Sequence, residues 1–228
     1  GNLIAGHRNN QQGPRLVLMS HMDEVGFMVD SITDDGFIKV LPIGGIYSAV
    51  SFAQRWQIVT PKGNVEGYSG YDAPHLLAND KKTAGTDLNK LFIDIGATSK
   101  QQAERQFGIR PGLSISPLSR FTKLSDRRYL AKSLDDRIGL AAITETLKNV
   151  SPRHQPNQLF AVATVQEEVG LRGASTAYAS TNADVAINVE IGLADDYPEV
   201  AATRKNHVKL GAGPTLFVYD RSMIPNQE

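Results

Sequence analysis

The sequence predicts an α/β fold, in which a mostly parallel-stranded α/β domain carries an inserted, small β-barrel-like domain. Near both ends of the chain, apolar runs of strand length alternate with helical segments, and this alternation is typical of parallel sheets. From about residue 25 to residue 129, short strand-like runs are separated by Gly- and Pro-containing turns, which is typical of a small barrel or sandwich. We expect residues 1–29 and 128–228 to form the α/β domain and residues 30–127 to form the inserted domain.

The composition excludes several classes of protein and site. The 228 residues are 41% hydrophobic and 21% charged, with a formal net charge of zero, as in an ordinary globular protein. This balance gives no electrostatic reason to expect a nucleic acid or an anionic membrane as partner, and no apolar run approaches the roughly 20 residues that span a bilayer. Cysteine is absent, which excludes disulfides and thiolate metal sites. Any metal must be held by His, Asp and Glu side chains.

The first predicted strand, residues 15–20, runs directly into His21-Met22-Asp23. In an extended chain His21 and Asp23 project to the same side. An imidazole steadied by a nearby carboxylate is common among metal ligands. A hydrogen-bonded structural histidine at a strand end explains the same pattern equally well.

The inserted region contains one helical segment among its strands. Ser99 is the expected N-cap of a helix over residues 100–107, and Gly108 ends it. Residues 68–82, which include His75, are expected to form an exposed loop. The predicted strands cover residues 26–29, 37–41, 56–60, 91–96 and 113–116.

Asp135 lies where a predicted strand, residues 128–133, gives way to an amphipathic helix over residues 138–150. Ile138 and Ala141 mark the expected apolar face of this helix. Because helix N-termini favour acids, a capping role for Asp135 is the ordinary alternative to a functional one.

Two adjacent carboxylates, Glu167 and Glu168, follow the apolar run at residues 159–163. Burying two carboxylates side by side is costly unless a cation or a shared proton offsets their repulsion. The ordinary alternative is a pair of solvated loop acids. Small residues at 174–179 are expected to begin the next helix.

Two further strands are predicted near the end of the sequence. Residues 183–189 form a third apolar run that leads into Glu190, and residues 215–219 form a last strand that ends at Asp220. Four side chains, those of His21, Asp135, Glu168 and Glu190, thus follow apolar strands at the edge where α/β sheets gather functional groups. Their nitrogen and oxygen donors suit Zn²⁺, Co²⁺ or Mn²⁺.

Four motifs together resemble the M42 family of metallo-aminopeptidases, the glutamyl and deblocking aminopeptidase type. In the family's order, these are His21-Met22-Asp23, Lys132-Ser133-Leu134-Asp135-Asp136-Arg137, Gln166-Glu167-Glu168-Val169-Gly170 and Asn188-Val189-Glu190. The resemblance covers nearly the whole chain, including the inserted domain, and makes the α/β domain the catalytic one.

The resemblance implies a centre with two divalent metal ions, Zn or Co. His21 and Glu190 would bind one ion, Glu168 would bind the second, and Asp135 would bridge the two.

Catalytic roles are implied for two further acids. Glu167 would be the general base and Asp23 would orient the imidazole of His21. Two metals about 3.5–4 Å apart can hold a water and lower its pKa towards ~7. Glu167 would then take the proton and return it to the leaving amine.

The same resemblance implies a cytoplasmic homo-oligomer acting on peptide substrates, and many relatives build twelve-subunit particles. It leaves the side-chain specificity open. A second metal-binding histidine belongs to the family pattern, but His7, His75, His154 and His207 stand in no matching motif. We expect this ligand beyond Glu228, with the α/β domain incomplete at both ends.

Two other functions are alternatives to this one. A glycoside hydrolase could use paired carboxylates, but sugar clefts usually need several aromatic platforms and Trp56 is the one tryptophan. A non-catalytic assembly scaffold is the second alternative, and the intact Glu167 argues against it.

Overall fold

The computed structural model describes residues 1–6, 12–70, 87–151, 153, 155–198, 208–220 and 222–226. The chain divides into two compact units, Gly1–Val189 and Glu190–Glu228. Each unit is described by itself. Among the helices in the described ranges, none combines the length and the apolar character needed to cross a membrane.

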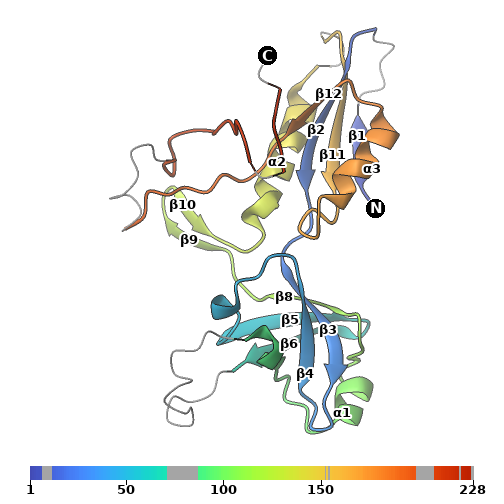
Figure 1. The fold of residues 1–228 in the computed structure, drawn as a ribbon, viewed down its shortest axis with the longest axis vertical. Helices are drawn as coiled ribbons and strands as arrows, with labels where there is room; N and C mark the ends of the chain where they lie inside the picture. Colours follow the sequence, from blue (N-terminus) through green and yellow to red (C-terminus); the bar gives the residue numbers. More distant parts are fainter. Residues whose placement is uncertain are drawn as a thin grey trace. The chain divides into compact units, whose positions relative to one another are not determined.

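A four-stranded sheet with the strand order β1-β11-β2-β12 lies in the first unit (Figure 1). Strands β11 and β12 both run parallel to β2, and β1 pairs antiparallel with β11 at one edge. Parallel neighbours bring the carboxyl ends of β2, β11 and β12 to the same edge of the sheet. The strands are β1 (Leu3–Gly6), β2 (Arg15–His21), β11 (Gln158–Thr164) and β12 (Val185–Asn188).

Helices α2 (Leu134–Asn149) and α3 (Arg172–Thr181) cover opposite faces of this sheet (Figure 1). Side chains along a strand alternate between its faces. Leu18 therefore packs in one apolar cluster with Ile143 of α2, whereas Val17 packs in another with Ala177 of α3. The result is a three-layer arrangement with an apolar cluster on each side of the sheet.

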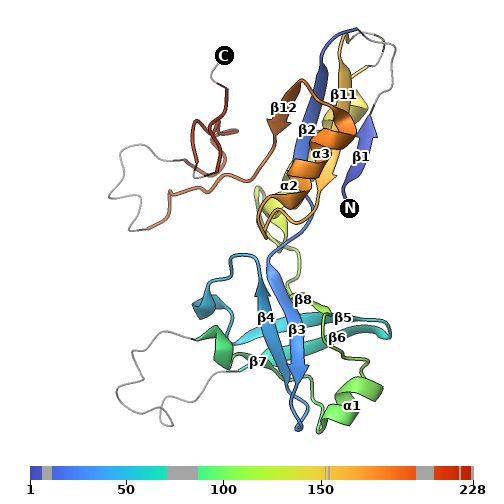
Figure 2. The same ribbon diagram turned by 45° about the vertical axis from the view of Figure 1, so that its right-hand side comes forward.

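A six-stranded antiparallel sheet, with the order β6-β5-β8-β3-β4-β7, forms the barrel-like region. Figure 2 shows the β5–β6 hairpin crossing the β3–β4 pair steeply. Tyr68 and Asp94 exchange two main-chain hydrogen bonds of 2.9 Å, which connect β6 to the chain just after β7 and nearly close the sheet. The strands are β3 (Gly26–Ile32), β4 (Ile38–Ile43), β5 (Gln54–Thr60), β6 (Gly63–Ser69), β7 (Phe92–Ile93) and β8 (Ser114–Pro117).

This sheet encloses a single continuous apolar cluster. Phe27 and Trp56 meet edge to face, with ring centroids 4.9 Å apart, and the indole N–H donates to the Ser69 hydroxyl at 2.9 Å. The buried tryptophan therefore has its polar atom satisfied. Ile38, Ile58 and other aliphatic side chains complete the cluster.

The shorter elements complete the first unit. As predicted, the Ser99 side chain caps α1 (Lys100–Arg105) by accepting from the Gln102 N–H at 3.2 Å. Strands β9 (Thr122–Ser125) and β10 (Arg128–Leu130) form a separate hairpin. Two 3₁₀ turns are η1 (Ser48–Val50) and η3 (Leu88–Lys90).

No helix or strand forms in the second unit within its described residues, 190–198, 208–220 and 222–226. Asp195 accepts from the Val208 N–H at 2.9 Å. The Asp220 carboxylate accepts from the N–H groups of Ser222 and Met223 and from the Ser222 hydroxyl. The two bonds from Ser222 lower the pKa of Asp220.

The predicted fold class is confirmed: a mostly parallel α/β sheet and a barrel-like β sheet are both present. Three element predictions are wrong. The strand over residues 128–133 is only Arg128–Leu130 and pairs with β9, outside the α/β sheet. Residues 215–219 form no strand, because no described segment pairs with them.

Helix α2 is the third correction. It begins at Leu134, and its buried residues are Asp136, Gly139 and Ile143, whereas Ile138 is exposed. The helix is therefore rotated relative to the predicted apolar face.

Of the predicted loop at residues 68–82, residues 71–82 lie outside the described ranges, as does His75. The domain boundaries stay a prediction.

Candidate metal centre

Three segments bring the predicted site residues of the first unit to the carboxyl edge of the four-stranded sheet. His21 is the last residue of β2, Asp135 lies in the first turn of α2, and Glu167 and Glu168 follow β11. Asp135 was expected to follow a sheet strand, but it reaches the site from the start of a helix.

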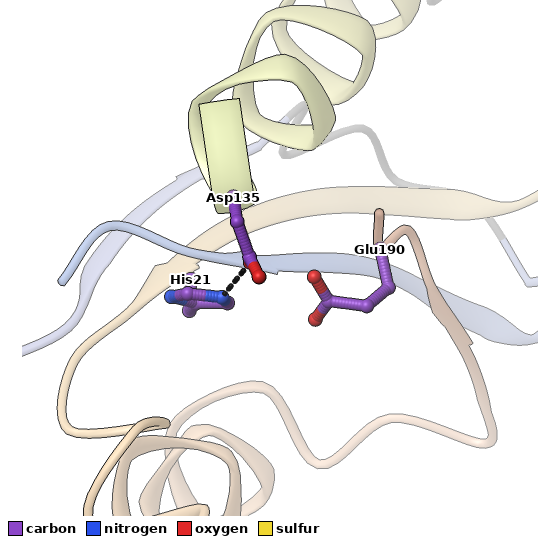
Figure 3. A group of neighbouring side chains, drawn as sticks. All are labelled: His21, Asp135 and Glu190. Carbon is purple, nitrogen blue, oxygen red and sulfur yellow. Dashed lines mark hydrogen bonds and ion pairs between the residues drawn. The ribbon is translucent and has the colours of Figure 1, made fainter. Parts of the chain in front are cut away.

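His21 is 2% exposed, and both of its ring nitrogens face oxygen atoms. Nδ1 lies 3.0 Å from the main-chain oxygen of Asp23, and Nε2 lies 2.9 Å from Oδ1 of Asp135 (Figure 3). Because a carbonyl oxygen only accepts, Nδ1 carries a proton. Nε2 is therefore the nitrogen turned towards the carboxylates, as a metal ligand would be.

The Asp23 side chain holds the backbone that carries the acid pair. Its Oδ1 accepts from the Glu167 N–H at 3.1 Å, and its Oδ2 accepts from the Glu168 N–H at 3.2 Å. Oδ1 also lies 3.7 Å from Nδ1 of His21. The carboxylate thus connects the turn after β11 to the end of β2, a role that the sequence did not reveal.

A tight turn presents Glu167 and Glu168. Gln166 adopts a left-handed backbone with φ of 57°, and the carbonyl of Glu167 accepts from the N–H groups of Gly170 and Leu171, both at 2.9 Å. A Cβ at Gly173 would lie 2.2 Å from the Val165 carbonyl oxygen. Glycine there allows α3 to pack directly against the backbone that leads into the turn.

The ligand atoms of His21, Glu167 and Glu168 lie within 4.8 Å of one another. Burial raises the pKa of Glu167, and the negative charges of Asp23 and Asp135 add to this rise while His21 opposes it. Burial also raises the pKa of Glu168, with further increases from Asp135 and Glu167. A cation at this place would relieve the repulsion among the carboxylates.

The donor chemistry of this group fits a divalent metal ion. An imidazole nitrogen and carboxylate oxygens, without sulfur, suit Zn²⁺, Co²⁺ or Mn²⁺. The solvated-loop alternative for the acid pair is weakened, because neither Glu167 nor Glu168 is fully exposed.

Glu190 directly follows Val189 and begins the second unit. Its Oε1 accepts from the N–H of Ile191 at 3.0 Å. The other histidines, His7, His75, His154 and His207, lie outside the described residues.

The capping role that was the ordinary alternative for Asp135 is filled by its neighbour, Asp136. Oδ1 of Asp136, not of Asp135, accepts from the Gly139 N–H at 2.9 Å. Asp is a preferred N-cap residue at either position, so the residue types alone do not distinguish Asp135 from Asp136. Asp135 and Asp136 are joined by a cis peptide bond.

Comparisons with known proteins give consistent results. Residues 1–228 match the family described as M42 glutamyl aminopeptidase. A lysyl aminopeptidase of Pyrococcus furiosus is 35% identical over 96% of this chain and 61% of its own length. The chain thus spans less than two thirds of that relative.

Two solved structures are also similar. A TET aminopeptidase from a marine sediment thaumarchaeon matches with a TM-score of 0.91 and 38% identity, over 100% of this chain and 64% of its own. A Pyrococcus horikoshii TET1 peptidase, described as able to assemble into a tetrahedron or a large octahedral shell, matches with a TM-score of 0.74 and 30% identity, over 83% and 56%.

Proposed function

The chain belongs to the M42 glutamyl aminopeptidase family, and on this premise we propose that the whole protein is a metal-dependent aminopeptidase. It would remove residues from the N-terminus of short peptides. The single observation that carries the proposal is the convergence of His21, Glu167 and Glu168, whose ligand atoms lie within 4.8 Å of one another.

The proposed metal ligands are His21, Asp135 and Glu168, with Asp135 as the bridge between two ions. The 2.9 Å separation of His21 Nε2 and Asp135 Oδ1 supports a shared role for these two groups. The resemblance in motif adds Glu190 as a further ligand. Zn²⁺ and Co²⁺ are the proposed ions.

When bound, divalent ions would supply Lewis acidity, polarising the peptide carbonyl and making the attacking water more acidic. Glu167 is proposed as the general base that takes the proton of this water and returns it to the leaving amine. Its position supports this role, because Oε2 of Glu167 lies 4.0 Å from Nε2 of His21, the proposed metal-binding nitrogen.

Asp23 is proposed to orient the site in two ways. Its main-chain oxygen fixes the tautomer of His21, and its carboxylate fixes the backbone of Glu167 and Glu168. We also propose that the whole protein is a homo-oligomer, on the basis of its similarity to the TET1 peptidase that assembles into closed shells.

The test is an activity assay on the complete natural protein. Metal-loaded protein should release the chromophore from aminoacyl-anilides and leave polysaccharides intact, and chelation should abolish the release until Zn²⁺ or Co²⁺ is restored. Hydrolysis that survives complete metal removal, or cleavage of polysaccharide instead, would overturn the proposal.

A further inference from the structure

We propose that Ser20 and Asp136 form a positioning pair that fixes His21 and Asp135 relative to each other before metal binds. The inference rests on the proposed function, because it assigns a role to residues beneath the metal ligands. Neither residue is a ligand. Ser20 acts through the next residue in the chain, His21, and Asp136 acts through the residue before it, Asp135.

The pair connects the two ligand-bearing segments directly. Ser20 precedes His21 at the end of β2, and Asp136 follows Asp135 at the start of α2. The Ser20 hydroxyl lies 3.0 Å from the main-chain oxygen of Asp136 and also contacts its Oδ2. A bonded pair therefore lies next to the contact between His21 and Asp135.

Both side chains are buried, at 1% exposure for Ser20 and 0% for Asp136. Oδ1 of Asp136 accepts from the Gly139 N–H at 2.9 Å, so each carboxylate oxygen has a partner. A buried polar network of this kind holds its members in one arrangement when every group is satisfied. By capping the helix, Asp136 leaves the Asp135 carboxylate free to face His21.

The space around the pair is closed. A Cβ added at Gly139 would lie 2.4 Å from Oδ1 of Asp136 and 2.6 Å from the Ser20 hydroxyl oxygen. These distances are shorter than any ordinary van der Waals contact, so only glycine allows α2 to approach β2 here. A larger residue at position 139 would therefore displace the pair or the helix.

Strand β11, which pairs with β2 in the sheet, also makes hydrogen bonds to the backbone around His21. The Thr164 hydroxyl is 3.3 Å from the Ser20 carbonyl oxygen, and the Thr164 carbonyl accepts from the Met22 N–H at 2.9 Å. The backbone around His21 is therefore fixed to β11 as well as to α2. Residues that orient metal ligands typically change metal affinity 10–100-fold when removed.

The experiment compares two variants of the complete natural protein by titrating the metal-free forms with Co²⁺. Ser20→Ala removes the contact and keeps the charge of Asp136, so its Kd for Co²⁺ should rise about 10–100-fold. Asp136→Asn removes the charge but can still accept from Gly139 and donate to Ser20, so its Kd should rise less. Ile143→Val is the matched control, because it alters the same helix–sheet contact away from the pair. It should lower Tm by about 2–4 °C and leave Kd unchanged.

A second readout does not need metal. The imidazole NMR signals of His21 should shift or broaden in Ser20→Ala and stay unchanged in Ile143→Val, even in a protein that binds no Co²⁺. A native protein without Co²⁺ binding would count against the proposed function alone. Native His21 signals and native Kd in Ser20→Ala would overturn the positioning role. A greater loss in Asp136→Asn than in Ser20→Ala would also overturn it, since Asp136 would then act through its charge.

Discussion

The six-stranded and four-stranded sheets of the first unit bury different kinds of side chain. The six-stranded sheet surrounds one continuous apolar cluster, and the buried polar residues near it, Ser51, Thr60 and Ser69, are uncharged hydroxyls. The four-stranded sheet has two smaller clusters on its two faces, and its carboxyl edge buries His21 and Asp136.

This difference indicates that the six-stranded sheet contributes mainly to stability and that the carboxyl edge of the four-stranded sheet carries the reactive groups. Apolar burial contributes roughly 25 cal/mol per Å² to folding wherever it occurs, whereas buried ionisable groups oppose folding unless they are paired. We therefore expect substitutions in the six-stranded sheet to change stability and leave the metal centre intact. Substitutions at the carboxyl edge of the four-stranded sheet should change metal binding or catalysis.

The largest expected effect is on the proposed reaction. Glu167→Gln keeps the shape of the side chain but cannot accept a proton, so kcat for aminoacyl-anilide hydrolysis should fall roughly 10²–10⁴-fold. Bound metal and Tm should stay near native. Glu66→Gln, an exposed change on β6, is the control and should leave kcat unchanged. A Glu167→Gln enzyme of native kcat would remove this residue as the general base.

A substitution in the six-stranded sheet tests the role of its apolar cluster in stability. Phe27→Ala removes a 1% exposed ring from the contact with Trp56 and should lower the free energy of unfolding by about 3–5 kcal/mol. Denaturant titration measures this cost. The Kd for Co²⁺ should not change at temperatures where the variant is folded.

Phe121→Ala is the matched control, because Phe121 is exposed beside Tyr129. Its cost should be about 1 kcal/mol or less. If Phe27→Ala weakened Co²⁺ binding in the folded state, the two sheets would be energetically coupled and the separation would fail.

The smallest effect is a pH dependence of the metal-free protein. Burial raises the pKa of Glu168 above its ordinary 4.5, so the native state holds this proton more tightly than the unfolded chain. The resulting contribution to stability is present below the unfolded pKa and is lost as pH rises through the folded pKa.

Replacing Glu168 with Gln removes the titrating group, so the variant does not lose this contribution to stability as pH rises. Metal-free Glu168→Gln should therefore have a higher Tm than native protein at pH 7, with the difference disappearing as pH falls to about 4.5. Saturating Zn²⁺ should reverse the order, because the variant lacks a proposed ligand. A Tm difference that is independent of pH would contradict the burial argument.

Much of the fold could be predicted because it follows local patterns. The apolar run leading to His21 predicted β2, and the Ser99 cap predicted α1. Strand β6 was missed, because Gly63, Asn64 and Glu66 are poor strand formers and pairing with β5 overrides this preference. Residues 215–219 show the opposite error, since their strand-like composition has no partner among the described residues.

The site was predictable in its residue types but not in its connections. Carboxylates and a histidine after apolar runs indicated a metal centre. The roles of Asp23 and Asp136 depend on contacts between residues more than one hundred positions apart in sequence, such as Asp23 with Glu167 and Ser20 with Asp136. No local pattern encodes such distances, because they are set by how β2, β11 and α2 pack.

The central claim is that this edge of the four-stranded sheet is a metal centre built around Asp135. Equilibrium dialysis of the complete natural protein against Zn²⁺, followed by metal analysis, tests it most directly. Native protein should hold two ions per chain, Asp126→Asn on the exposed β9–β10 turn should match it, and Asp135→Asn should hold fewer ions. Native stoichiometry and affinity in Asp135→Asn would contradict the account.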